Sequence, residues 1–268
     1  LLLLITLPLF WAMPMALAAC ELGSAMPNTG FYDWTKRALG PFWGFLSAWW
    51  WTLATLVDTS LYVVLAANYL QGYLGFNQSL FYFACWFVIG AFAVINILGL
   101  RLVALSSVIF SVLIISPFLV LIIVGLANWQ FNPFHPIVPP GQNLMGGDGA
   151  LILGLSVGLW MYSGYESLST LSGEMSNSER IIPKALMLAL PFVALMYLLP
   201  TLASLAAFGQ WDRFGVAGTG DSVSFIDIGR SLGGTALGHA LLASALLGNL
   251  ALYLDYMGSV SYTHLRAH

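Results

Sequence analysis

Residues 102–127, LVALSSVIFSVLIISPFLVLIIVGLA, form an apolar run that contains no charged residue. A helix needs about 20 such residues to cross the hydrocarbon core of a bilayer. The run is too long for a strand, and it lacks the alternation of polar and apolar residues that is typical of a membrane β-barrel. It therefore predicts a transmembrane α-helix.

Six further stretches have the same character. We expect them to form spans near 1–22, 42–70, 80–99, 150–171, 185–208 and 234–257. Charged residues make up 7% of the chain and hydrophobic residues 59%, whereas a soluble domain has roughly 25% charged residues. The composition predicts an all-α membrane protein with seven spans in one transmembrane domain, residues 1–260.

Both ends of the chain depart from this pattern. The first residue is Leu1, inside an apolar run and without the basic region of a signal peptide. Residues 261–268, SYTHLRAH, have no apolar periodicity and resemble a non-native tail. We therefore expect a fragment that is truncated at both ends.

The basic residues between the spans predict the orientation of the chain. Three loops that would lie on one side of the membrane hold Lys36 and Arg37, Arg101, and Arg180 and Lys184. Cytoplasmic loops carry an excess of Lys and Arg, so these loops are expected in the cytoplasm and the protein in the cytoplasmic membrane. The first span would then begin outside, which requires an odd number of preceding spans if the intact N-terminus is cytoplasmic.

Several classes of function find no support in the residues. A net charge of −3 gives no basic face for nucleic acid. Cys20 and Cys85 lie within apolar runs, where they are expected to pack rather than to bind metal. Neither a paired nucleophile and base nor a phosphate-binding glycine loop is present. We therefore expect no metal, no cofactor and no enzymatic activity.

Acidic residues inside the spans are the informative exceptions, because a charge at mid-membrane costs roughly 2.5–3.5 kcal/mol on insertion scales. Asp58 lies about 24 Å along its helix from Phe42, beyond the midplane, and Tyr62 follows four residues later on the same face. One interpretation is a counter-charge for a cation or a proton carrier. The alternative is an acid bonded to a neighbouring helix.

A second acid, Glu166, follows the stretch 154–165, GLSVGLWMYSGY. Gly154 and Gly158 would form a face of small residues for close helix contact. Ser163 and Gly164 would weaken the helix near the middle of the span, and a broken helix exposes backbone groups that many transporters use to bind substrate. A continuous helix with a packing glycine is the alternative.

A third acid, Asp255, lies near the cytoplasmic end of the last span. Asn249, Tyr253 and Tyr256 accompany it at helical spacing. It could take part in gating or proton coupling, or its side chain could extend to the membrane interface.

Several motifs together give the chain a family resemblance. They are ELGSAMPNTGFYDW (21–34), ALGPFWG (38–44), NILG (96–99), WMYSGYES (160–167), Gly173-Glu174 and IPKA (182–185). In order and spacing, these motifs are similar to those of the amino acid–polyamine–organocation (APC) superfamily of permeases, nearest its polyamine and amino acid uptake branch. The resemblance covers the chain up to Gly258.

This resemblance implies a LeuT-like fold of two inverted five-helix repeats, of which the chain would cover helices 2–8. It also implies a substrate pocket between broken helices 1 and 6, lined by helices 3 and 8. The substrate-binding residues that it suggests, together with those reasoned above, are Trp160, Tyr162, Ser163, Gly164, Tyr165, Glu166, Asp58, Tyr62, Asn249 and Tyr253. Glu166, Asp58 and Asp255 are the candidates for gating or proton coupling. The glycine-rich segment of helix 1 would lie before Leu1.

The function that these expectations describe is secondary active transport. The substrate would be an amino acid or a polyamine, moved across the cytoplasmic membrane by alternating access with proton coupling or exchange. The partners would be this small molecule and the lipid bilayer, with no nucleic acid. A membrane sensor or scaffold that has the same fold and does not transport is the alternative.

Overall fold

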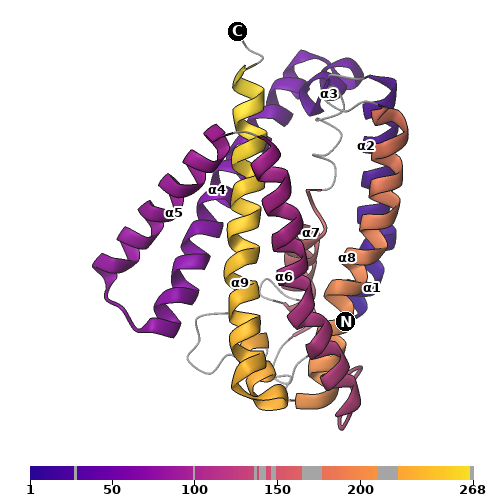
Figure 1. Cartoon of the computed structure of the whole chain (residues 1–268). Helices are drawn as coiled ribbons and strands as arrows, with labels where there is room; N and C mark the ends of the chain where they lie inside the picture. Colours follow the sequence, from indigo (N-terminus) through magenta and orange to yellow (C-terminus); the bar gives the residue numbers. More distant parts are fainter. Residues whose placement is uncertain are drawn as a thin grey trace. The chain divides into compact units, whose positions relative to one another are not determined.

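The computed structural model describes residues 1–26, 29–98, 100–135, 138, 143–145, 149–164, 177–209 and 223–265. Every regular element among these residues is a helix (Figure 1). The elements are α1 (Leu2–Leu7), the π-helix η1 (Pro8–Ala12), α2 (Met13–Ala25), α3 (Phe31–Leu39), α4 (Pro41–Leu74), α5 (Gln78–Leu98), α6 (Leu100–Ala127), α7 (Ala150–Met161), α8 (Ser178–Phe208) and α9 (Phe225–Leu265). The expected all-α class is confirmed.

Within the described part of the chain, six helical segments are long and apolar enough to cross a bilayer. They are Leu2–Ala25, Pro41–Leu74, Gln78–Ile95, Val108–Ala127, Arg180–Phe208 and Phe225–Tyr256. The seventh expected span, 150–171, is helical over Ala150–Met161, and its residues from 165 onward lie outside the described part of the chain. This span remains a prediction.

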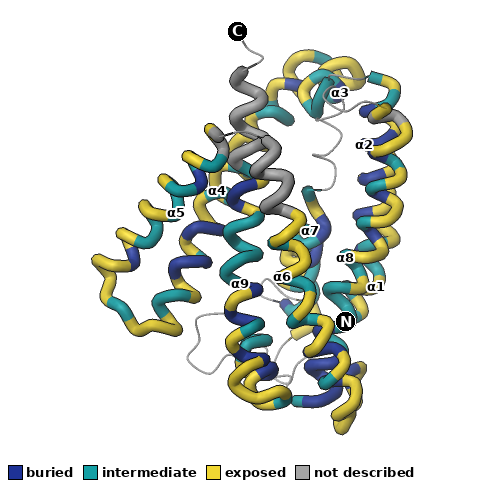
Figure 2. The backbone as a smooth tube through the Cα atoms, in the orientation of Figure 1, coloured by how far each residue is buried: buried dark blue, intermediate teal, exposed yellow. Residues whose placement is uncertain are grey.

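Large apolar side chains lie on the outside of these helices, and Figure 2 shows exposed residues along α5, α4 and α2. Phe10 is 79% exposed, Trp86 71% and Leu188 75%. Extended apolar surface of this kind is rare on a soluble monomer. In hydrocarbon it is the expected surface of a helix whose backbone hydrogen bonds are all internal.

The chain divides into two compact units. The first comprises Leu1–Trp49 and Gly125–Val223, and the second comprises Trp50–Val124 and Ser224–His268. In the first unit, α1, η1 and α2 form one apolar span that packs against α7 and α8. Its buried core consists of Leu7, Ala12, Ala16, Cys20, Tyr162, Ile182, Leu186 and Leu190. Cys20 therefore packs in a core, as expected.

Glycines allow α7 to lie close to α1. A Cβ atom at Gly154 would be 2.6 Å from Cδ1 of Leu3, and one at Gly158 would be 2.3 Å from Cδ1 of Leu7. Real Cβ atoms do not approach other atoms so closely, so a side chain at either position would force the leucine side chain to shift, and the two glycines lie where α7 meets α1. The predicted face of small residues is confirmed.

Two helices begin earlier than the apolar pattern predicts. α8 begins at Ser178 rather than near 185, with Pro183 inside it. α9 begins at Phe225 rather than near 234, and Gly234, with φ 73°, interrupts it at the expected start. A proline near a helix end removes only one intrahelical hydrogen bond. The apolar stretches therefore mark the expected spans, and the helices extend beyond them.

The second unit is built around α9. Its core consists of Tyr62, Val63, Phe92, Tyr253 and Leu254, with Cys85 among the partly buried residues packed on it. The segment before Gly234 folds back on the segment after it, because a Cβ atom at Gly229 would be 2.2 Å from Cδ1 of Leu241. In a straight helix these two residues would be about 18 Å apart.

Candidate functional site

The stretch after α7 is non-helical where the sequence suggested a break. Tyr162, the residue after Met161, has φ −101° and ψ 16°. Gly164 has φ +105°, a conformation that residues with a side chain rarely adopt. The continuous helix through Ser163 and Gly164, one of the two interpretations above, is therefore wrong.

Ser163 closes the end of α7. Its backbone N–H donates to the carbonyl oxygen of Trp160 at 3.2 Å, and its hydroxyl donates to the same oxygen at 2.8 Å. Trp160 itself is 44% exposed, and Ser163 is also exposed. The helix end therefore presents an indole ring beside a backbone that is held by a local serine cap.

Tyr162 points in the opposite direction, into the core of the first unit, where it is 1% exposed. Its hydroxyl donates to the carbonyl oxygen of Leu4 at 3.0 Å. Its ring meets that of Tyr197 on α8 edge to face, with centroids 5.4 Å apart. Tyr162 thus anchors the end of α7, whereas the sequence suggested contact with substrate.

Sequence reasoning missed Leu4 and Tyr197 as neighbours of this site. Pro8 is the signal that could have identified Leu4, because a proline leaves the carbonyl four residues earlier without its α-helical donor. Tyr165 and Glu166 lie outside the described residues. Their roles in substrate binding and gating stay predictions.

Asp58 lies on α4 and is half-buried in the second unit. The hydroxyl of Tyr256, on α9, donates to its Oδ2 atom at 3.5 Å. The ring of Tyr256 also contacts that of Tyr62, with centroids 5.7 Å apart. Asp58 and Tyr62 therefore share one face of α4, as predicted, and Asp58 has the hydroxyl of a neighbouring helix as a partner.

The remaining candidates on α9 have different environments. Tyr253 is 4% exposed, and its ring packs edge to face on Phe92 at 6.0 Å between centroids. The carboxamide of Asn249 donates to the carbonyl oxygen of Ala245 within the same helix at 2.7 Å. Asp255 is exposed. Core packing is therefore the role that these contacts describe for Tyr253.

Each unit thus contains its own candidates. The first unit holds Trp160, Tyr162, Ser163 and Gly164, and the second holds Asp58, Tyr62, Asn249, Tyr253 and Asp255. Among the described residues, no group of three or more His, Cys, Asp or Glu side chains could hold a metal ion.

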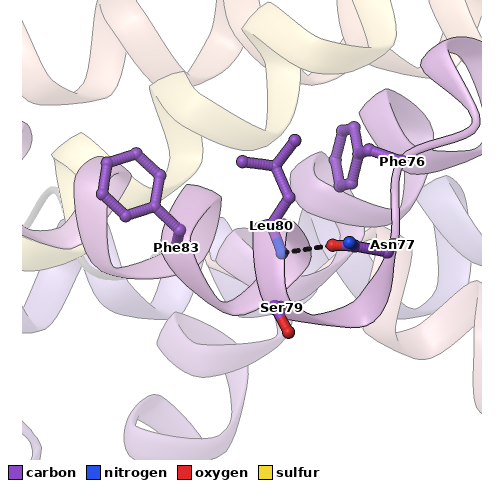
Figure 3. Close-up of a pocket in the computed structure, with 5 residues that line it drawn as sticks. All are labelled: Phe76, Asn77, Ser79, Leu80 and Phe83. Carbon is purple, nitrogen blue, oxygen red and sulfur yellow. Dashed lines mark hydrogen bonds between the residues drawn. The ribbon is translucent and has the colours of Figure 1, made fainter.

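A hollow of about 520 Å³ lies at the turn between α4 and α5, away from these candidates in the sequence. It is lined by Phe76, Asn77, Ser79, Leu80 and Phe83 (Figure 3). The side-chain oxygen of Asn77 accepts a hydrogen bond from the backbone N–H of Leu80 at 3.0 Å, which caps the first turn of α5. This asparagine serves the helix end.

Comparison with known proteins matches nearly the whole chain. The family model described as amino acid permease matches residues 1–263. Two similar plant proteins are named polyamine transporters. PUT1 of Oryza sativa subsp. japonica is 32% identical, over 96% of this chain and 47% of its own length. RMV1 of Arabidopsis thaliana is 30% identical, over 96% of this chain and 51% of its own length. The serine/threonine exchanger SteT of Bacillus subtilis (strain 168) is 26% identical over 85% of this chain and 51% of its own length.

The chain thus spans about half the length of the curated relatives it matches. The match confirms the resemblance to the APC superfamily, because the family model extends over the described spans and the motifs between them. On this ground, and with the apolar surface of its helices, the chain belongs to the amino acid permease family and is a multi-pass membrane protein.

Proposed function

We propose that the protein containing this chain is a secondary active transporter of polyamines or amino acids in the cytoplasmic membrane. It works by alternating access, with proton coupling or exchange. The observation that carries the proposal is the match of the amino acid permease family to residues 1–263. The names of the relatives, polyamine transporters and a serine/threonine exchanger, support the substrate class.

The end of α7 is the proposed substrate contact within the first unit. A helix that ends inside a membrane has carbonyl groups without intrahelical partners, and these carry partial negative charge. Such groups suit the ammonium group that amino acids and polyamines share. The exposed indole of Trp160 adds a ring face that attracts a cation.

Asp58 is the proposed source of negative charge for a cationic substrate or a proton within the second unit. It is half-buried, and among the described residues its hydrogen-bond partner on α9 is the hydroxyl of Tyr256. The hydroxyl of Tyr256 adds no positive charge that would offset a carboxylate. An acid at this position therefore supports a cationic substrate or a coupled proton over a carrier of neutral solutes alone.

The orientation of the chain follows from its basic residues. Lys36 and Arg37 lie in the last turn of α3, and Arg180 and Lys184 are exposed near the start of α8. The expected loops at these positions are helical, and Arg101 likewise lies in the first turn of α6. We place these segments and Arg101 in the cytoplasm. Single cysteines introduced at positions 37 and 180 should not be labelled from the outside of intact cells. Efficient labelling would show that the orientation is the opposite of the one proposed.

Uptake by reconstituted vesicles tests the proposed function. The chain is expressed as part of a protein of the full length of its relatives, and uptake of labelled putrescine, arginine and leucine is compared. We expect saturable uptake of at least one of them. Absence of uptake in folded protein would favour the sensor or scaffold.

A charge-removing variant tests the substrate class. Asp58→Asn keeps an oxygen acceptor for Tyr256 but removes the charge, and we expect it to lower kcat/KM for a cationic substrate at least about tenfold, or ~1.4 kcal/mol. Asp33→Asn, in the first turn of α3, is the matched control outside the spans. Uptake of leucine alone, unchanged by Asp58→Asn, would contradict the cationic substrate and the coupled proton.

A further inference from the structure

Pro8 disturbs the backbone of the first span at one carbonyl group. In a regular α-helix the carbonyl oxygen of Leu4 accepts a hydrogen bond from the amide of residue 8. Residue 8 is proline, which has no amide hydrogen. From Pro8 the chain continues as the π-helix η1, a distortion that is frequent at functional sites. In hydrocarbon no water is available for such a carbonyl.

Tyr162 supplies the missing hydrogen from a distant part of the chain. Its hydroxyl donates to the carbonyl oxygen of Leu4 at 3.0 Å, and the residue is 1% exposed. Tyr162 is also the first residue after α7 and immediately precedes the exposed Ser163. One hydrogen bond therefore joins the proline-distorted span to the beginning of the non-helical stretch.

Tyr162 lies in the buried core of the first unit together with Leu7. Gly158, one turn earlier on α7, allows the side chain of Leu7 to approach so closely that a Cβ atom would lie 2.3 Å from it. The ring of Tyr197 meets that of Tyr162 at 79°. The ring of Tyr162 thus belongs to a closely packed core, and its hydroxyl has a fixed direction.

We propose that Tyr162 is a positioning residue: its hydroxyl replaces the hydrogen that Pro8 lacks, and thereby fixes the end of α7, with Trp160 and Ser163, against the first span. The inference rests on the proposed function in one respect, namely that this end of α7 contacts substrate. Pro8 leaves the carbonyl oxygen of Leu4 without its α-helical donor, and the hydroxyl of Tyr162 is a donor to that oxygen.

A double-mutant cycle tests the pairing without reference to substrate. Tyr162→Phe is made in the full-length protein and again with Pro8→Ala, which restores an amide hydrogen for Leu4. We expect Tyr162→Phe to lower the melting temperature by about 2–4 °C in the parent and by less than half as much in the Pro8→Ala protein. Tyr197→Phe, which removes the other hydroxyl of the ring pair, should show no dependence on residue 8. An equal loss in both backgrounds would overturn the pairing.

Transport kinetics test the positioning of the site. Tyr162→Phe should raise KM for the transported substrate about two- to tenfold, the range of one net hydrogen bond, and the rise should be smaller with Pro8→Ala. A merely structural role would lower the amount of folded protein and leave KM unchanged, and that result would refute positioning. If no substrate is transported by the parent, the proposed function fails, whereas the melting cycle still decides whether the pair exists.

Discussion

Whether an alanine at Gly125, on α6, raises or lowers the stability of the protein depends on tertiary packing. A Cβ atom at this position would lie 2.9 Å from both the Cβ atom and the carbonyl oxygen of Ala203, and 3.0 Å from its carbonyl carbon. Ala203 is fully buried on α8. Most of the obstructing atoms are helix backbone, which cannot rotate away as the end of a side chain can.

The surrounding contacts keep the two helices from separating. The backbone N–H groups of Gln130 and Phe131, just after α6, both donate to the carbonyl oxygen of Ala206 at 2.8 and 2.9 Å. Overpacking at such a contact costs about 1–3 kcal/mol. Replacing glycine by alanine inside a helix gains at most about 1 kcal/mol. Because most of the obstructing atoms are backbone, we take the upper part of this cost, about 2–3 kcal/mol, so that after the gain Gly125→Ala destabilises the protein by about 1–2 kcal/mol.

Thermal unfolding of the full-length protein in detergent measures this effect. The loss corresponds to a melting temperature lower by about 2–8 °C. Gly90→Ala is the matched control, because Gly90 is exposed on α5 and a Cβ atom there meets nothing within 4 Å. It should raise the melting temperature by about 2–4 °C. If Gly125→Ala is as stable as the parent, α6 and α8 are not packed as closely as described.

Three further substitutions test local features. Ser163→Ala removes the hydroxyl bond to the carbonyl oxygen of Trp160 and should lower stability by about 0.5–1.5 kcal/mol, measured by thermal unfolding. Gly164→Ala places a side chain at φ +105° and should cost about 1–3 kcal/mol, together with a higher KM for transport; an unchanged KM would separate this glycine from the site. Trp34→Phe loses the indole bond to Oγ1 of Thr29 at 2.7 Å and should destabilise the protein by about 1 kcal/mol without changing KM, whereas a changed KM would link this interaction to transport.

The membrane spans were predictable because lipid acts on each helix separately. A segment such as 102–127 is apolar on every side, so its composition alone indicates its environment. Composition does not indicate where a helix begins: α8 and α9 begin at Ser178 and Phe225, before the expected spans 185–208 and 234–257, because helix geometry continues into polar sequence. Burial in lipid sets the limits of an apolar span, whereas backbone hydrogen bonding sets the limits of a helix.

The candidate site was predictable in part. The end of α7 near Ser163 and Gly164 was visible in the sequence, because glycine and serine weaken a helix locally. The direction in which each side chain points was not visible. Trp160 is exposed and Tyr162 is buried, although both were expected to contact substrate.

What the sequence by itself determined is the class of the protein: helices in lipid, three costly acids, and the ordered motifs of a permease family. What only the tertiary structure decided is which groups satisfy one another. Leu4 and Tyr162 lie 158 positions apart, and Asp58 and Tyr256 lie 198 apart, yet each pair shares a hydrogen bond. The physical reason is that hydropathy is a property of a segment, whereas a hydrogen bond between distant residues requires the packing of whole helices.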